Sequence, residues 1–87
     1  MRNQKMDDHP GAGYKRSKKL EGRYANYFKV GHNAFEFVLD FGQYYPEIEE
    51  AELYTRIITS PQYAKELLST LQESIERHEN SYGRIKK

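Results

Sequence analysis

The sequence lacks cysteine altogether and has only three prolines and six glycines in 87 residues. Without a thiol, neither a disulfide nor a thiolate metal site is available to stabilise the fold. A chain this short forms one domain at most, and it buries only about 60% of the surface that it exposes when unfolded. Its stability therefore depends on some other support, such as a second subunit.

Long hydrophobic runs are also missing. Apolar residues make up 37% of the sequence and charged residues 31%. No stretch of about 18 apolar residues is present to span a membrane, and the N-terminus has no apolar signal core. We expect a soluble cytoplasmic protein that does not associate with membranes.

The formal net charge of +1 conceals an uneven distribution. Residues 1–23 hold seven basic and three acidic side chains, whereas residues 24–87 hold seven basic and ten acidic ones. The first segment has too few apolar residues to offset the entropy of ordering itself. We therefore predict a disordered basic arm over residues 1–22 and a folded β-β-β-α domain over residues 23–87.

Alternation of apolar and polar residues predicts three strands, over residues 24–32, 35–41 and 53–59. The second is the clearest, because its odd positions are large and apolar while Glu36 and Asp40 point the other way, with Asp40 expected to face solvent; the odd positions are Phe35, Phe37, Leu39 and Phe41. Residues 31–34 suit a tight hairpin. The acidic stretch 47–52 is expected to be a solvated connection.

A long amphipathic helix is predicted from Pro61 to Tyr82, with Ser60 as its N-cap and Gly83 just past its end. Apolar and amphipathic residues recur along it at spacings of three and four: Ala64, Leu67, Leu68, Leu71, Ile75, His78 and Tyr82. The expected fold class is α+β, a three-stranded antiparallel sheet covered by this one C-terminal helix.

The helix, at roughly 33 Å, is longer than a seven-residue strand of about 23 Å. Both faces of the sheet carry apolar or aromatic candidates, and the second face is assigned Val38, Ile58, Tyr27 and Tyr54. Because one helix cannot cover two faces, we expect a homodimer. The alternative is a monomer with scattered surface aromatics, which are ordinary in proteins.

Motifs for catalysis, metal binding and nucleotide binding are absent from the sequence. The three histidines have no ligand spacing, so no metal and no cofactor are expected. A third hypothesis places an enzyme or ligand site at a dimer interface, where two copies of His32, Asp40 and Arg56 converge.

Tyrosine is plentiful, with eight residues, and it favours protein interfaces. We predict a non-enzymatic interaction module or accessory subunit that binds a protein partner through Tyr44, Tyr45 and Tyr54. The alternative is a nucleic-acid-associated protein anchored by its basic arm, through Lys15, Arg16, Lys18 and Lys19.

The order and spacing of several short motifs over residues 22–87 resemble a small bacterial and archaeal domain family of unknown function, numbered 3467. The motif positions are Tyr24, Asn26, Phe37, Asp40, Phe41, Gly42, Arg56, Ser60 and Pro61. The resemblance implies a β-β-β-α domain and offers no catalytic residue to transfer. Residues 1–21 are expected to lie outside it.

Overall fold

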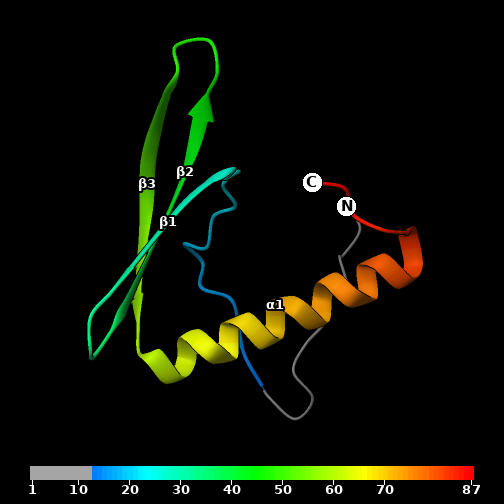
Figure 1. Ribbon diagram of the computed structural model, residues 1–87. Helices are drawn as coiled ribbons and strands as arrows, with labels where there is room; N and C mark the ends of the chain where they lie inside the picture. The colour runs from blue at the N-terminus through cyan, green and yellow to red at the C-terminus, as the bar shows by residue number, and fades with distance from the viewer. Residues whose placement is uncertain (1–12) are drawn as a thin grey trace.

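The computed structural model describes residues 13–87 and contains three strands followed by one helix (Figure 1). The strands are β1 (Tyr27–His32), β2 (Phe37–Tyr45) and β3 (Glu50–Thr59), and the helix is α1 (Pro61–Tyr82). The strands form one antiparallel sheet in the order β1-β2-β3. The predicted α+β class and the β-β-β-α order are confirmed.

Residues 13–26 contain neither helix nor strand. The predicted disordered arm over residues 1–22 falls partly on residues 1–12, which lie outside the described residues, and its disorder stays a prediction. β1 begins at Tyr27, later than the predicted Tyr24, because the side chain of Asn26 takes over the pairing. The Asn26 N–H donates to the Gly42 carbonyl at 2.9 Å, and Asn26 Oδ1 accepts from the Tyr44 N–H at 2.7 Å.

The first hairpin turns at Asn33. Its side-chain Oδ1 accepts hydrogen bonds from the N–H groups of Phe35 (2.8 Å) and Glu36 (2.9 Å), and its own N–H donates to the Glu36 carbonyl at 3.0 Å. An asparagine that hydrogen-bonds to the backbone just ahead of it stabilises a turn. The predicted hairpin is confirmed, and Phe35 belongs to this turn rather than to β2.

The second hairpin corrects the expectation for the acidic stretch 47–52. The turn is closed by hydrogen bonds from Ile48 N–H to the Tyr45 carbonyl and from Glu49 N–H to the Pro46 carbonyl, each 3.3 Å. Glu49 adopts a left-handed φ of 53°, which completes the reversal, so β3 already begins at Glu50. Since β1 begins at Tyr27, opposite Gly42, the parts of β2 and β3 beyond Gly42 project past it as a two-stranded ribbon (Figure 1).

A β-bulge lies at the centre of the β2–β3 pair. Phe41 pairs with Thr55 but Gly42 pairs with Leu53, so Tyr54 has no partner on β2. A Cβ on Gly42 would lie 2.9 Å from the Leu53 Cα and closer still to the Glu52 carbonyl oxygen. Only glycine therefore allows β3 to approach β2 this closely.

The helix has the predicted bounds and the predicted ends. The Tyr63 N–H donates to Ser60 Oγ at 3.2 Å, Gly83 has a φ of 96°, and its N–H donates to the Glu79 carbonyl. An i, i+4 ion pair lies along the helix, with the Arg77 guanidinium 3.8 Å from the Glu73 carboxylate.

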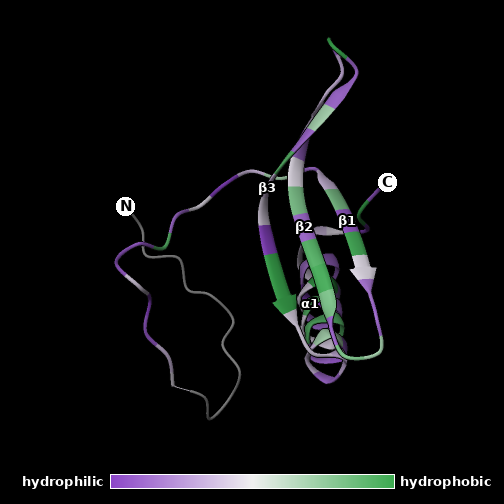
Figure 2. Ribbon diagram, turned by 90° about the vertical axis from the view of Figure 1, so that its left-hand side faces the viewer, coloured by the Kyte–Doolittle hydropathy of each residue, from purple (hydrophilic) through white to green (hydrophobic). Residues whose placement is uncertain are grey.

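The helix does not cover the sheet, contrary to the prediction. It leaves the end of β3 and runs away from the strands (Figures 1 and 2), and none of its residues is buried. Only Ser60 separates Thr59, the last residue of β3, from Pro61, the first residue of α1. A connection of one residue leaves no slack for the helix to fold back onto its own sheet. Across residues 13–87, no apolar side chain is buried.

Candidate interaction surface

One face of the sheet is largely apolar and carries no permanently charged side chain. The cross-strand register places three side chains of β2 in line with three from β1 and three from β3. We call this set the apolar face: Phe37, Leu39, Phe41, His32, Val30, Phe28, Thr59, Ile57 and Thr55. The predicted alternation in β2 is confirmed for its Phe37, Leu39 and Phe41.

Aromatic rings contact one another across the strands of the apolar face. The Phe28 and Phe41 rings meet edge to face, with centroids 5.8 Å apart, and the His32 ring stacks on Phe37 at 5.3 Å. These contacts fix the side chains without covering them, since Phe28 is 59% exposed and Val30 is 61% exposed. Within one chain, the apolar face is a surface and not a core.

The helix carries the second uncovered apolar surface. We call it the helix stripe, and it consists of the seven predicted positions Ala64, Leu67, Leu68, Leu71, Ile75, His78 and Tyr82. Leu68 is 56% exposed and Leu71 is 53% exposed.

The helix leaves the sheet on the side of the apolar face. Figure 1 shows α1 and residues 13–26 on the same side of the sheet. Within residues 13–26, four residues line a hollow together with Phe41 of the apolar face: Lys19, Glu21, Arg23 and Ala25. The side from which α1 leaves is therefore the side that carries the apolar face.

The opposite face carries a row of charges, which we call the charged face: Lys29, Asp40 and Arg56. Asp40, expected to face solvent, is only 9% exposed. Arg56 donates two hydrogen bonds to it, from Nε to Oδ1 and from a terminal nitrogen to Oδ2, both 2.8 Å. This bidentate pair, helped by the nearby Lys29, lowers the pKa of Asp40 below its ordinary value, and it raises the pKa of Arg56.

The hypothetical site of His32, Asp40 and Arg56 is divided between the two faces. His32 lies opposite Phe37 on the apolar face, whereas Asp40 and Arg56 pair with each other on the charged face. A single chain therefore does not bring the imidazole to the ion pair. Among residues 13–87, no three histidine, aspartate or glutamate side chains are grouped to hold a metal ion.

The three predicted tyrosines do not form one patch. Tyr44 stacks on Tyr27 with ring centroids 6.5 Å apart, on the charged-face side of the ribbon. Tyr45, its neighbour in β2, points to the opposite side. Tyr54 lies at the bulge and lines a hollow with Phe41 on the apolar-face side. Tyr44 and Tyr45 thus share the ribbon, and Tyr54 is separate from them.

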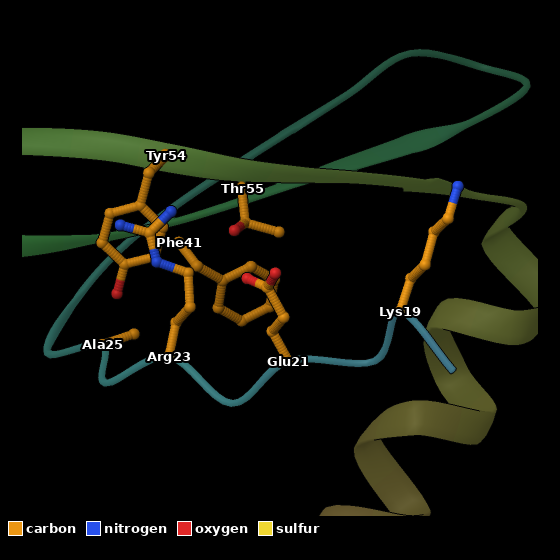
Figure 3. A pocket seen from close by; sticks show the side chains of 7 residues that line it. All are labelled: Lys19, Glu21, Arg23, Ala25, Phe41, Tyr54 and Thr55. Carbon is orange, nitrogen blue, oxygen red and sulfur yellow. The ribbon is translucent and has the colours of Figure 1, made fainter. Parts of the chain in front are cut away.

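Tyr54 is held by the segment that precedes β1 (Figure 3). The Arg23 guanidinium lies 3.7 Å above the centre of the Tyr54 ring, a cation–π contact. The Tyr54 hydroxyl is buried and has no hydrogen-bond partner among the described residues. Seven residues line an open hollow of about 410 Å³ here: Lys19, Glu21, Arg23, Ala25, Phe41, Tyr54 and Thr55. The Arg23–Tyr54 contact was not predicted, because it depends on the bulge, which sequence patterns do not show.

The basic residues predicted for nucleic acid, Lys15, Arg16, Lys18 and Lys19, are all exposed. Lys19 borders the Tyr54 hollow, while the Arg16 guanidinium lies 5.1 Å from the centre of the Tyr14 ring. A turn near Ser17 orders this region locally, since Ser17 Oγ accepts from the Lys19 N–H at 3.0 Å.

Within the described part of the chain, no helix has both the length and the apolar character needed to cross a membrane. Comparison with known families finds a match over residues 2–87 to the sequence model of a protein of unknown function, DUF3467. The match extends into the basic segment, which was expected to lie outside it. No curated protein and no solved structure matches the chain.

Proposed function

Since the chain belongs to DUF3467, a family of proteins of unknown function, we propose a function from its surface: a non-enzymatic interaction module that forms a homodimer and binds a protein partner. We place this module in the cytoplasm. The observation that carries the proposal is the complete lack of a buried apolar side chain within residues 13–87.

The exposed surface is too large for a compact single chain. The protein exposes 8388 Å², whereas a compact monomer of 10.3 kDa exposes about 5,400 Å². Residues 1–12, which lie outside the described residues, can account for at most about 2,000 Å² of this surface, the whole surface of an unfolded chain of that length. At least about 6,400 Å² therefore belongs to residues 13–87, which would expose about 4,800 Å² in a compact domain.

The excess of about 1,600 Å² per chain matches what a stable pair requires. Two chains would bury about 3,200 Å² together, and obligate dimers bury about 2,000 to 5,000 Å². The surface that would be buried is also of the right kind, because the apolar face and the helix stripe are largely hydrophobic. A partner subunit supplies the support that the missing disulfides cannot.

The projecting ribbon supports the second half of the proposal. It extends beyond β1, so the outer edge of β3 has no strand beside it in the described chain, while the β2 edge is contacted by Asn26, which accepts from the Tyr44 N–H. The ribbon also carries Tyr44 and Tyr45. Exposed edges add strands from other proteins, and tyrosine side chains add contact area at low entropic cost. The ribbon is therefore the expected docking element for a protein partner.

Sedimentation equilibrium of the full chain tests the dimer, with twice the mass of one chain expected at micromolar concentration. A single-chain mass at high micromolar concentration contradicts the proposal, because the exposed surface would then have no occupant.

Partner binding is tested by affinity capture with the double variant Tyr44→Ala and Tyr45→Ala. We expect the captured protein to be lost while the dimer and the circular dichroism spectrum stay unchanged. Tyr24→Ala is the matched control, since Tyr24 is 69% exposed but lies outside the ribbon. Unfolding of the double variant would show instead that the two side chains are structural.

Nucleic acid binding is the second candidate, favoured by the exposed cluster Lys15, Arg16, Lys18 and Lys19. If all four side chains contact phosphates, the logarithm of the binding constant should fall with the logarithm of salt with a slope of about −3 to −4. Gel retardation of the full chain and of a chain lacking residues 1–21 measures this. Retardation that is unchanged by the truncation would exclude the cluster as the anchor.

A further inference from the structure

We infer that, in the dimer proposed above, the helix stripe of each chain lies on the apolar face of the other chain. The inference rests on the proposed dimer and adds its architecture: α1 is exchanged between the two copies. The helix of each chain then covers the sheet of its partner, whereas the sequence predicted that it would cover the sheet of its own chain. The occupant of the apolar face is thus a second copy of this chain.

The connection between β3 and α1 prevents the same contact within one chain. Ser60 is the only residue between them, and it is fixed at both ends. Its carbonyl accepts from the Ala64 N–H at 2.9 Å, its Oγ accepts from the Tyr63 N–H, and Pro61 has a restricted φ. Connections that fold a helix back over its strand usually have about two to six residues. This one-residue connection at Ser60, which we call the elbow, therefore holds the apolar face and the helix stripe of one chain apart.

The helix stripe is long enough for the apolar face. From Ala64 to Tyr82 it spans about 27 Å, and the five residues of β2 from Phe37 to Phe41 span about 17 Å. A helix laid along the strands would cover the apolar face and extend beyond it. Because α1 leaves from the side of the sheet that carries the apolar face, a two-fold axis lets both helices do this at once (Figure 1).

The chemistry of the surfaces also agrees. Neither the apolar face nor the helix stripe contains an acidic side chain, lysine or arginine, and each has a single histidine, His32 and His78. Joining them therefore desolvates no permanent charge of either set, and the charged residues that border the apolar face, Lys19, Glu21 and Arg23, lie at its Phe41 end. The charged face, by contrast, carries Lys29, Asp40 and Arg56, and covering it with an apolar helix would desolvate charged groups.

Lengthening the elbow is the most direct test. Six glycine and serine residues inserted between Thr59 and Ser60 would give α1 the slack to reach its own apolar face. We expect this variant to sediment as a monomer with unchanged helix content. The same insertion between Ala34 and Phe35, in the first hairpin, is the control and should remain dimeric.

The outcomes separate the architecture from the dimer itself. If the elbow variant dimerises as tightly as the unmodified chain, the exchange of helices is wrong while the proposed dimer stands. If the unmodified chain is already a monomer, the proposed dimer fails first and the exchange with it.

Cross-linking provides a second test, made simple by the lack of native cysteine. Chains carrying Leu39→Cys and chains carrying Leu71→Cys are mixed, allowed to exchange subunits and treated with a short bismaleimide. We expect a product that joins the two different chains. Lys29→Cys, on the charged face, replaces Leu39→Cys as the control and should give none. A product between Lys29→Cys and Leu71→Cys chains, or between two Leu71→Cys chains alone, would overturn the inference.

Discussion

Substitution of Leu71, midway along the helix stripe, tests most directly whether a partner chain covers the helix. The Leu71 side chain is 53% exposed in a single chain, the remainder being covered by its own helix and close neighbours. In a monomer, Leu71→Ala would remove little burial, and alanine is the better helix former. The change would then leave the free energy of unfolding almost unaltered or would raise it slightly.

In a dimer that covers the helix stripe, the same change has a large cost. Full burial of a leucine contributes about 1.5 to 3 kcal/mol, and about half of that remains to be gained when the partner covers Leu71. The loss is about 0.8 to 1.5 kcal/mol per chain, hence about 1.5 to 3 kcal/mol for the pair. This corresponds to a dissociation constant weakened by about 10- to 150-fold.

Sedimentation equilibrium at several concentrations measures that constant, and circular dichroism verifies that the helix persists. Glu66→Ala is the matched control, because Glu66 lies on the side of α1 away from the helix stripe and its truncation should leave dimerisation intact. An unchanged dissociation constant for Leu71→Ala would refute the reasoning, since it would mean that the partner does not cover the helix stripe.

Three further predictions concern the folded chain. Gly42→Ala should lower the free energy of unfolding in urea by about 1 to 3 kcal/mol because its Cβ would meet the β3 backbone, whereas Gly31→Ala, with no atom within 4 Å of the new Cβ, should change it by less than about 0.5 kcal/mol. The lowered pKa of Asp40 means that its pairing with Arg56 stabilises the fold fully above about pH 5 and less as pH falls through the folded pKa. Between pH 5 and pH 3, the free energy of unfolding of Asp40→Asn, measured by urea titration at each pH, should therefore decline less than that of the unmodified chain. An equal decline in the two proteins would contradict the pairing. Ser60→Ala should lower thermal stability by about 0.5 to 2 kcal/mol through loss of the N-cap, a cost that Ser60→Thr should largely restore.

The features that the sequence predicted well are those determined by residues close together in the chain. The bounds of α1 follow from Ser60, Pro61 and Gly83, whose effects are local. The face of β2 follows from alternation, which cannot be shifted by one residue without exposing every apolar side chain. The first hairpin likewise depends on Asn33 and its immediate neighbours.

The features that were missed depend on how distant segments meet. Extending the second hairpin from its turn without interruption would pair Asp40 with Thr55. The bulge at Tyr54 shifts the register by one and brings Arg56 opposite Asp40 instead. Opposite charges near the centres of two adjacent strands were a usable signal for this ion pair. The path of α1 was also missed, because amphipathicity shows that a helix needs a partner but not which chain supplies it.

The elbow at Ser60 has a consequence for cooperativity. Packing between elements is concentrated within the sheet, so an isolated chain has little to make its helix and its strands melt together. Most of the stability of a helix in a protein comes from packing of its apolar face, which a single chain does not provide for α1. In dilute solution the helical signal should therefore fade over a broad temperature range, separately from the sheet. A single sharp transition would be a property of the assembled pair, and its midpoint would rise with protein concentration.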